Sequence, residues 1–187
     1  LEVLRRGVDP HDEESVVKVA QSVSMSVEPT PGGAQRTIVG GEDVTALIRS
    51  AEVDSIVSPV SVYPAVRAHM VKLQRAIAQD ADVVMDGRDI GSVVLAESRC
   101  KFYLTASPQE RAARRQRDYA AQGRRVGLDT VCEEIAQRDM IDSTRRVSPL
   151  AVVPDAIVID CTAMSPAEVV TAMMQVVGGA DTCSTQL

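Results

Sequence analysis

The chain has few aromatic residues and little histidine, and both shortages limit what it can do. Aromatic residues make up 2% of the 187 residues, with two histidines and no tryptophan. Aliphatic side chains and methionine must therefore fill the core, and no row of rings is available to stack on single-stranded nucleic acid. The net charge of −6 argues against binding to nucleic acid or to a membrane surface.

Cysteine pairs, long apolar runs and leader sequences are missing as well. The four cysteines are scattered and form no C-x-x-C pair, and His11 stands apart from His69. The sequence therefore predicts no metal site of its own. No apolar run reaches the length of a membrane span, and no signal peptide is visible. We expect a protein of the reducing cytoplasm with no membrane partner.

Short apolar segments alternate with helical ones along the chain. Residues 83–85, 101–105 and 156–160 are typical of buried strands, and helices are expected at residues 12–23, 51–58, 64–77, 107–123, 129–138 and 165–177. Ser-Pro-x-Glu capping boxes begin the last helix and the one at Ser107. The alternation favours an α/β fold with a parallel sheet. A half-buried strand predicted at residues 23–27 and a small hairpin predicted at residues 36–44, around Gly40-Gly41, indicate an inserted lobe.

Charged residues gather where one apolar segment ends. The sequence Asp-Gly-Arg-Asp at 86–89 directly follows residues 83–85, and in open α/β sheets ligands bind at the carboxyl ends of the strands. Farther along, Arg138, Asp142 and Arg145 share one face if their helix continues. Such a face can hold a phosphate and a sugar hydroxyl together. The alternative, an exposed ion pair, stays open.

Arginine outnumbers lysine, which contributes only three of the 20 basic residues. The guanidinium fork suits phosphate. The arginine-rich stretch at 111–125 is either a solvated helix face or a mobile flap that places guanidiniums on phosphates during transfer. The sequence contains no G-x-x-x-x-G-K-[ST] or G-x-G-x-x-G loop. The first residues read as the end of a helix already under way, so we expect N-terminal sequence to be missing.

Several segments together resemble the bacterial cytidylate kinases, the (d)CMP kinases of the nucleoside-monophosphate (NMP) kinase group. The matching segments are Asp-Gly-Arg-Asp-Ile-Gly-Ser-Val-Val at 86–94, Leu-Thr-Ala-Ser-Pro-Gln-Glu-Arg-Ala at 104–112, Asp-Ser-Thr-Arg-Arg-Val-Ser-Pro-Leu at 142–150 and Asp-Ala-Ile-Val-Ile-Asp at 155–160. The resemblance follows the family's order over nearly the whole chain.

The resemblance implies an α/β fold with a parallel-sheet, P-loop kinase-like core, from which the first strand and the P-loop are missing here. It also implies an NMP-binding lobe with a β insert and a short LID. Carried onto this sequence, the core helices lie at 1–22, the NMP-binding lobe at 23–80, the LID at 111–128, and the rest of the core at 81–110 and 129–187.

The activity that the resemblance implies is transfer of the γ-phosphoryl group of ATP to CMP or dCMP, with Mg²⁺, giving CDP or dCDP. The P-loop ligands of ATP and Mg²⁺ are absent from this chain, so the chain by itself is expected to be inactive. The resemblance also implies a monomer. Two alternatives stay open: a catalytically inactive module that binds CMP, and a kinase for another monophosphate such as UMP.

The resemblance also implies the site residues. Those expected to read cytosine are Ser58, Arg67 and Asp89, and those expected to hold the ribose are Arg138 and Asp142. Those expected to grip the acceptor phosphate are Arg88 and Arg145, with Asp86 beside them in the substrate site. The arginines expected to act in catalysis are Arg88, Arg138 and Arg145, together with Arg111, Arg114 and Arg115 of the LID.

Overall fold

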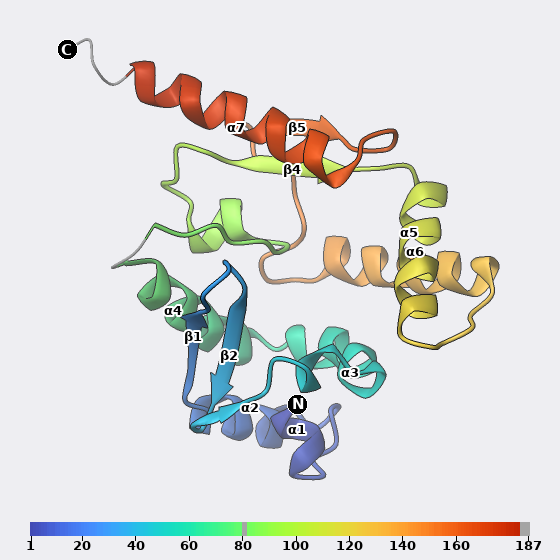
Figure 1. Cartoon of the computed structure of the whole chain (residues 1–187). Helices are drawn as coiled ribbons and strands as arrows, with labels where there is room; N and C mark the ends of the chain where they lie inside the picture. The colour runs from blue at the N-terminus through green and yellow to red at the C-terminus, as the bar shows by residue number, and fades with distance from the viewer. Residues whose placement is uncertain (80–81, 184–187) are drawn as a thin grey trace. The chain divides into compact units, whose positions relative to one another are not determined.

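The computed structural model describes residues 1–79 and 82–183 and divides the chain into two compact units (Figure 1). The first unit comprises residues Leu1–Gly87 and Arg145–Ser148, and the second comprises Arg88–Thr144 and Pro149–Leu187. Within the described residues, no helix is both long and apolar enough to span a membrane. These two units do not correspond to the predicted core, NMP-binding lobe and LID, and that predicted division stays a prediction.

The first unit combines helices with a small antiparallel sheet. Its elements are α1 (Glu2–Arg5), α2 (Glu13–Ser22), β1 (Met25–Pro29), β2 (Gln35–Val39), β3 (Glu42–Asp43), η1 (Leu47–Arg49), α3 (Ala51–Ser61) and α4 (Pro64–Gln79). The strands pair in the order β1-β2-β3, with Met25 opposite Val39. The strand predicted at residues 23–27 is confirmed as β1, and the hairpin predicted at residues 36–44 is confirmed as β2 and β3, with Ile38 opposite Asp43.

Two helices of the first unit begin where the sequence predicts. The side chain of Asp12 accepts a hydrogen bond from the backbone N–H of Ser15 (3.3 Å) at the start of α2, which satisfies a donor that the helix leaves unpaired. Helix α4 begins at Pro64, and its Val66 packs in one cluster with Val16 and Val19 of α2. Met70 of α4 packs against the same cluster, so α4 contributes to the core of this unit.

The second unit contains the parallel sheet. Its elements are η2 (Ile90–Val94, a π-helical turn), β4 (Phe102–Thr105), α5 (Pro108–Ala121), α6 (Leu128–Thr144), β5 (Ile157–Asp160) and α7 (Pro166–Cys183). β4 and β5 run parallel, from Phe102 opposite Ile157 to Thr105 opposite Asp160. Two of the three predicted core strands are confirmed, and the chain has a mixed α/β fold with a parallel sheet.

The third predicted core strand is wrong in this structure. Residues 83–85 lie in no strand, and Val84 is 89% exposed. An apolar run becomes a strand only when a neighbouring backbone pairs with its N–H and C=O groups. Among the described residues, the parallel pairing joins only β4 and β5. Apolar composition predicted the segment but could not supply its partner.

The capping box expected at α5 forms in one direction only. Ser107 accepts from the backbone N–H of Glu110 (3.2 Å), as expected. Its own N–H instead donates to the hydroxyl of Thr162 (2.9 Å), and the Glu110 carboxylate accepts from Arg114. A guanidinium outcompetes a single amide for that carboxylate because its bond is charge-assisted.

The last helix has the full capping box but ends later than predicted. The N–H of Ser165 donates to the Glu168 carboxylate (2.7 Å), and the N–H of Glu168 donates to the Ser165 hydroxyl (3.4 Å). Helix α7 then continues through the glycine pair 178–179 to Cys183. A glycine inside a helix costs about 1 kcal/mol relative to alanine, which does not by itself force an end.

We predict that Val16→Ala lowers the free energy of unfolding by about 2 kcal/mol, because Val16 is 1% exposed and the change removes two buried methyl groups. Urea unfolding followed by circular dichroism measures this change. The control is Val57→Ala, at a helical position that is 37% exposed, where the change should stay within about 0.5 kcal/mol. Equal losses in the two variants would contradict the assigned core.

Candidate functional site

A buried carboxylate near the end of α6 forms ion pairs with two arginines of the second unit. Asp142 is 4% exposed, and its Oδ2 accepts a hydrogen bond from Nε of Arg88 at 2.7 Å. Nε of Arg138, one helical turn earlier, lies 3.9 Å from the same oxygen. A buried carboxylate is tolerated when it is paired with cations. Arg88, Arg138 and Asp142, all predicted from the sequence, are therefore brought together.

The turn that carries Arg88 is shaped by its neighbour. The backbone carbonyl of Asp89 accepts from the N–H groups of Val93 (2.8 Å) and Val94 (3.2 Å), which closes the π-helical turn η2. Asp89 is 9% exposed. The expected charge cluster at 86–89 thus places a buried carboxylate and a half-exposed guanidinium on consecutive residues, although the strand expected before it does not form.

A second ion pair joins α5 to α6 one turn from the first. Nη1 of Arg111 donates to Oδ2 of Asp139 at 2.6 Å. Asp139 and Asp142 are three residues apart and so lie on one side of α6. Asp139 was absent from the set of predicted site residues, although its spacing from Asp142 was a usable signal. Arginines from α5 and from the turn before η2 therefore meet carboxylates of the same helix.

The helix that presents these carboxylates ends before Arg145. α6 runs to Thr144, so Arg138 and Asp142 lie on one continuous helix as expected, whereas the condition for a shared face, a helix that continues, is not met at Arg145. Nε of Arg145 donates to the backbone carbonyl of Ser148 (2.6 Å), in the short segment that belongs to the first unit. Ser148 has a φ of 49°, a left-handed conformation that turns the chain there.

The other two predicted arginines of α5 differ in their contacts. Arg114 donates from Nε to Glu110 (2.8 Å) and from Nη2 to the carbonyl of Cys161 (2.6 Å). Its hydrogen bond holds the pKa of Glu110 below the usual value. The bond to Cys161 connects α5 to the loop after β5, which favours a structural role for Arg114. Arg115 lies over the ring of Tyr119 instead.

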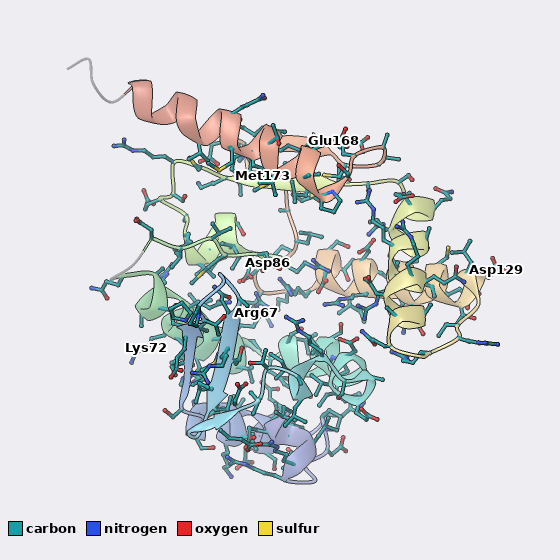
Figure 2. All side chains as sticks on the ribbon, in the orientation of Figure 1. Arg67, Lys72, Asp86, Asp129, Glu168 and Met173 are labelled. Atoms are coloured by element: carbon teal, nitrogen blue, oxygen red, sulfur yellow. The ribbon has the colours of Figure 1, made fainter. Side chains whose placement is uncertain are left out.

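The remaining predicted residues belong to the first unit. Nη1 of Arg67, on α4, donates to the carbonyl of Ser61 (3.2 Å), and the hydroxyl of Ser61 donates to the carbonyl of Ser58 (3.0 Å). Ser61, which the sequence reasoning missed, therefore connects Ser58 with Arg67. Asp86 is exposed in the segment after α4, and Figure 2 labels both Arg67 and Asp86.

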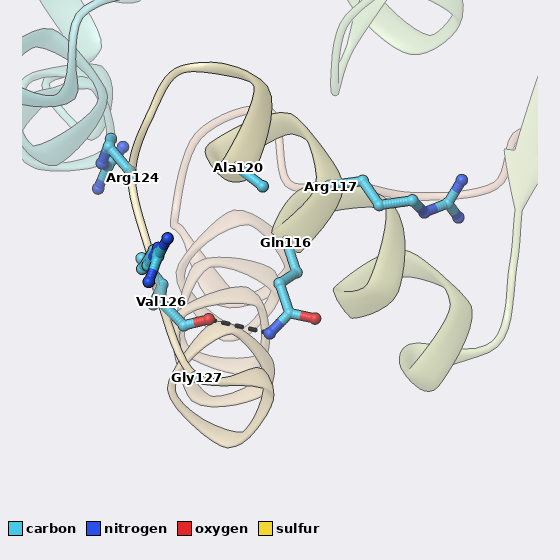
Figure 3. A pocket seen from close by; sticks show the side chains of 7 residues that line it. Gln116, Arg117, Ala120, Arg124, Val126 and Gly127 are labelled. Carbon is cyan, nitrogen blue, oxygen red and sulfur yellow. Dashed lines mark hydrogen bonds between the residues drawn. The ribbon is translucent and has the colours of Figure 1, made fainter.

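A pocket of about 470 Å³ lies where α5 turns into α6 and contains none of the predicted site residues. It is lined by Gln116, Arg117, Ala120, Arg124, Arg125, Val126 and Gly127. Gln116 donates to the carbonyl of Val126 across it (2.9 Å), and the head groups of Arg117 and Arg124 point away from each other (Figure 3). The guanidiniums of Arg117 and Arg124 therefore do not converge on one point of this pocket.

The described residues contain no group of three or more histidine, cysteine, aspartate and glutamate side chains placed to hold a metal ion. Local charge in the second unit therefore comes from guanidiniums and carboxylates. Such a site can bind phosphate and hydroxyl groups and stabilise charge that develops on phosphoryl oxygens. It contains no histidine for acid–base chemistry near neutral pH.

Comparison with known proteins gives one consistent result. Residues 1–178 match the family described as cytidylate kinase. The chain is 45% identical over 171 residues to the cytidylate kinase of Geobacillus kaustophilus, covering 91% of this chain and 76% of the relative. It is 47% identical over 171 residues to that of Mycobacterium avium (91% and 75%) and 44% identical over 178 residues to that of Mycobacterium leprae (95% and 78%).

We predict that Arg88 and Asp142 are energetically coupled. A double-mutant cycle with Arg88→Gln and Asp142→Asn should give a coupling free energy of about 1 kcal/mol, because Asp142 is buried while Arg88 is partly solvated. Urea unfolding of the four proteins measures it. The exposed pair Lys18–Glu14 is the control and should couple more weakly. Independent effects of Arg88→Gln and Asp142→Asn would contradict the pairing described above.

Proposed function

This chain belongs to the cytidylate kinase family. We propose specific roles for its residues in the transfer of a phosphoryl group from ATP to CMP. The observation that carries the proposal is the convergence of Arg88 and Arg138 on the buried Asp142, with Arg111 and Asp139 beside them. Phosphoryl transfer demands positioning and positive charge more than covalent chemistry. A site rich in arginine and without histidine meets that demand.

The acceptor phosphate of CMP is held by Arg88 and Arg145 in this proposal. Nε of Arg88 donates to Asp142. In this proposal its two terminal nitrogens form the bidentate fork that phosphate favours. Arg145 is also oriented through its Nε, which donates to the Ser148 carbonyl. Both guanidiniums are thus oriented before the nucleotide arrives, which lowers the entropy cost of binding.

The ribose and the base are recognised by the other predicted residues. Arg138 and Asp142 hold the ribose hydroxyls, because a carboxylate has several lone pairs and can accept a hydroxyl in addition to its arginine bonds. Cytosine is read by Ser58, Arg67 and Asp89: a carboxylate accepts from its amino group, and an arginine donates to its carbonyl. Asp86 completes the substrate site. dCMP is the second acceptor that we propose.

The arginines of α5 act on the phosphoryl group in transfer. Arg111 and Arg115 neutralise its oxygens as charge develops, and Arg114 supports α5 through the Cys161 carbonyl. We propose that residues 111–128 form the LID, residues 23–80 the NMP-binding lobe and the remainder the core of a cytoplasmic monomer. Mg²⁺ supplies charge neutralisation on the ATP phosphates; it is usually carried by those phosphates with few protein ligands.

The experiment that tests the transfer combines two measurements. Calorimetry with CMP measures binding by this chain, and a coupled assay of ADP formation measures turnover by the protein expressed from its complete gene. The 187 residues contain no G-x-x-x-x-G-K-[ST] loop, so binding and turnover are assayed separately. Heat from CMP together with ADP formation supports the kinase. Heat with no turnover by the complete gene product would favour the CMP-binding module.

We predict that Arg145→Ala lowers kcat/KM for CMP phosphorylation roughly tenfold or more, because it removes a charge contact to the acceptor phosphate. The coupled assay on the complete gene product measures this. Arg146→Ala is the matched control, since Arg146 is the neighbouring arginine and is exposed. Near-normal kcat/KM in Arg145→Ala would count against the role of Arg145.

Acceptor choice is the other expected outcome. CMP and dCMP should be phosphorylated in strong preference to UMP, because the carbonyl at position 4 of uracil offers no donor to Asp89. Initial rates with the three nucleotides at equal concentration measure the preference. A strong preference for UMP would contradict the roles proposed for Ser58, Arg67 and Asp89.

A further inference from the structure

Tyr119 is a buried aromatic residue in a chain that has almost none. The sequence contains three tyrosines and one phenylalanine, and Tyr119, on α5, is 5% exposed. Its ring packs with Ala112 of α5 and Val131 of α6 in the core cluster of the second unit. Val126 and Ile135 lie against the same cluster.

Two guanidiniums lie over the ring of Tyr119. The central guanidinium carbon of Arg115 is 4.8 Å from the ring centroid and that of Arg124 is 4.1 Å from it. Both distances are within the range at which the negative face of an aromatic ring attracts a cation. Arg115 is one helical turn before Tyr119 on α5. The ring thus attracts two positive charges, one from α5 and one from the segment after it.

The backbone after α5 brings Arg124 to the ring. Gly123 has a φ of 76°, which glycine adopts at little cost, and the N–H of Arg124 then donates to the carbonyl of Tyr119 (2.8 Å). The loop therefore folds back onto the last turn of the helix. The position of Arg124 is set by the backbone as well as by its contact with the ring.

The hydroxyl of Tyr119 fixes the other end of the ring. It donates to Oε2 of Glu134, on α6, at 2.9 Å. The ring is therefore held by packing on its apolar body and by a charge-assisted hydrogen bond at its tip. A ring with this anchorage presents its faces in a constant orientation.

We propose that Tyr119 is a positioning residue for the donor phosphates: its ring holds Arg115, and with it Arg124, where they meet the phosphoryl groups of ATP. The inference rests on the function proposed above for Arg115. Tyr119 acts through the arginines and does not contact the nucleotide. A tyrosine that merely filled the space between α5 and α6 would affect the stability of this unit and would have no particular effect on ATP.

The test compares three variants of the complete gene product. Tyr119→Leu keeps an apolar side chain in the core but removes the ring, while Tyr119→Phe keeps the ring and loses the bond to Glu134. Val131→Ala, at a position that is 0% exposed in the same cluster, loosens the core and leaves the ring in place. kcat and KM for ATP and for CMP are measured for each variant, with the melting temperature.

Tyr119→Leu should lower kcat/KM for ATP roughly three- to thirtyfold, the range that loss of a cation–π contact can produce, with KM for CMP unchanged. Tyr119→Phe should restore most of the loss. Val131→Ala should lower the melting temperature without a selective effect on ATP. If the unmutated protein phosphorylates CMP and Tyr119→Leu has the same kcat/KM for ATP, the inference fails while the proposed function stands. Equal kinetic losses in Tyr119→Leu and Val131→Ala would also overturn the inference.

A second measurement does not depend on activity. In the native protein, the side-chain Nε–H protons of Arg115 and Arg124 should resonate upfield in NMR spectra because of the ring current of Tyr119, and the shift should disappear in Tyr119→Leu. Unshifted protons in the native protein would overturn the inference. Upfield protons in a native protein that shows no ATP-to-CMP transfer would instead overturn the proposed function.

Discussion

The candidate site of the second unit depends on the need of one buried carboxylate for positive partners. Asp142 is almost fully shielded from water, and an ionised carboxylate in that position is costly unless cations satisfy it. Arg88 and Arg138 supply the cations, one from the turn before η2 and one from the same helix. The end of α6 and Arg88, which are far apart in sequence, are therefore held together by a single group.

This arrangement also explains why arginine and aspartate alternate in the site. Arg111 and Arg88 would repel each other if their charges were close and unpaired, but Asp139 and Asp142 each accept from one of them. Each carboxylate therefore compensates the charge of one guanidinium and fixes its orientation. For a reaction that needs aligned charge more than bond-making side chains, orienting the arginines in advance is the main contribution that a protein can make.

Local features of the fold could be predicted from the sequence, and features that need a distant partner could not. The helix starts at Asp12 and Pro64 and the β2–β3 hairpin depend on neighbouring residues, and all are confirmed. The strand expected at residues 83–85 needed a pairing backbone, which no pattern reveals. For the site, the sequence indicated Arg88, Arg138 and Asp142, whereas it did not reveal that α6 ends at Thr144, just before Arg145.

The arginine-rich helix shows why residue type alone could not decide between a solvated face and a working one. Arg111, Arg114 and Arg115 are alike in sequence, yet the first pairs with a carboxylate of α6, the second donates to a carboxylate of its own helix and to a distant carbonyl, and the third lies over an aromatic ring. A guanidinium whose terminal nitrogen already donates to backbone carbonyls, as Nη2 of Arg114 does, is a poor ligand for phosphate, because binding would require it to give those bonds up. Arg115 is oriented differently, because the face of the Tyr119 ring attracts the plane of its guanidinium. The partners of an arginine therefore decide what it can do, and those partners are set by the packing of α5 against α6.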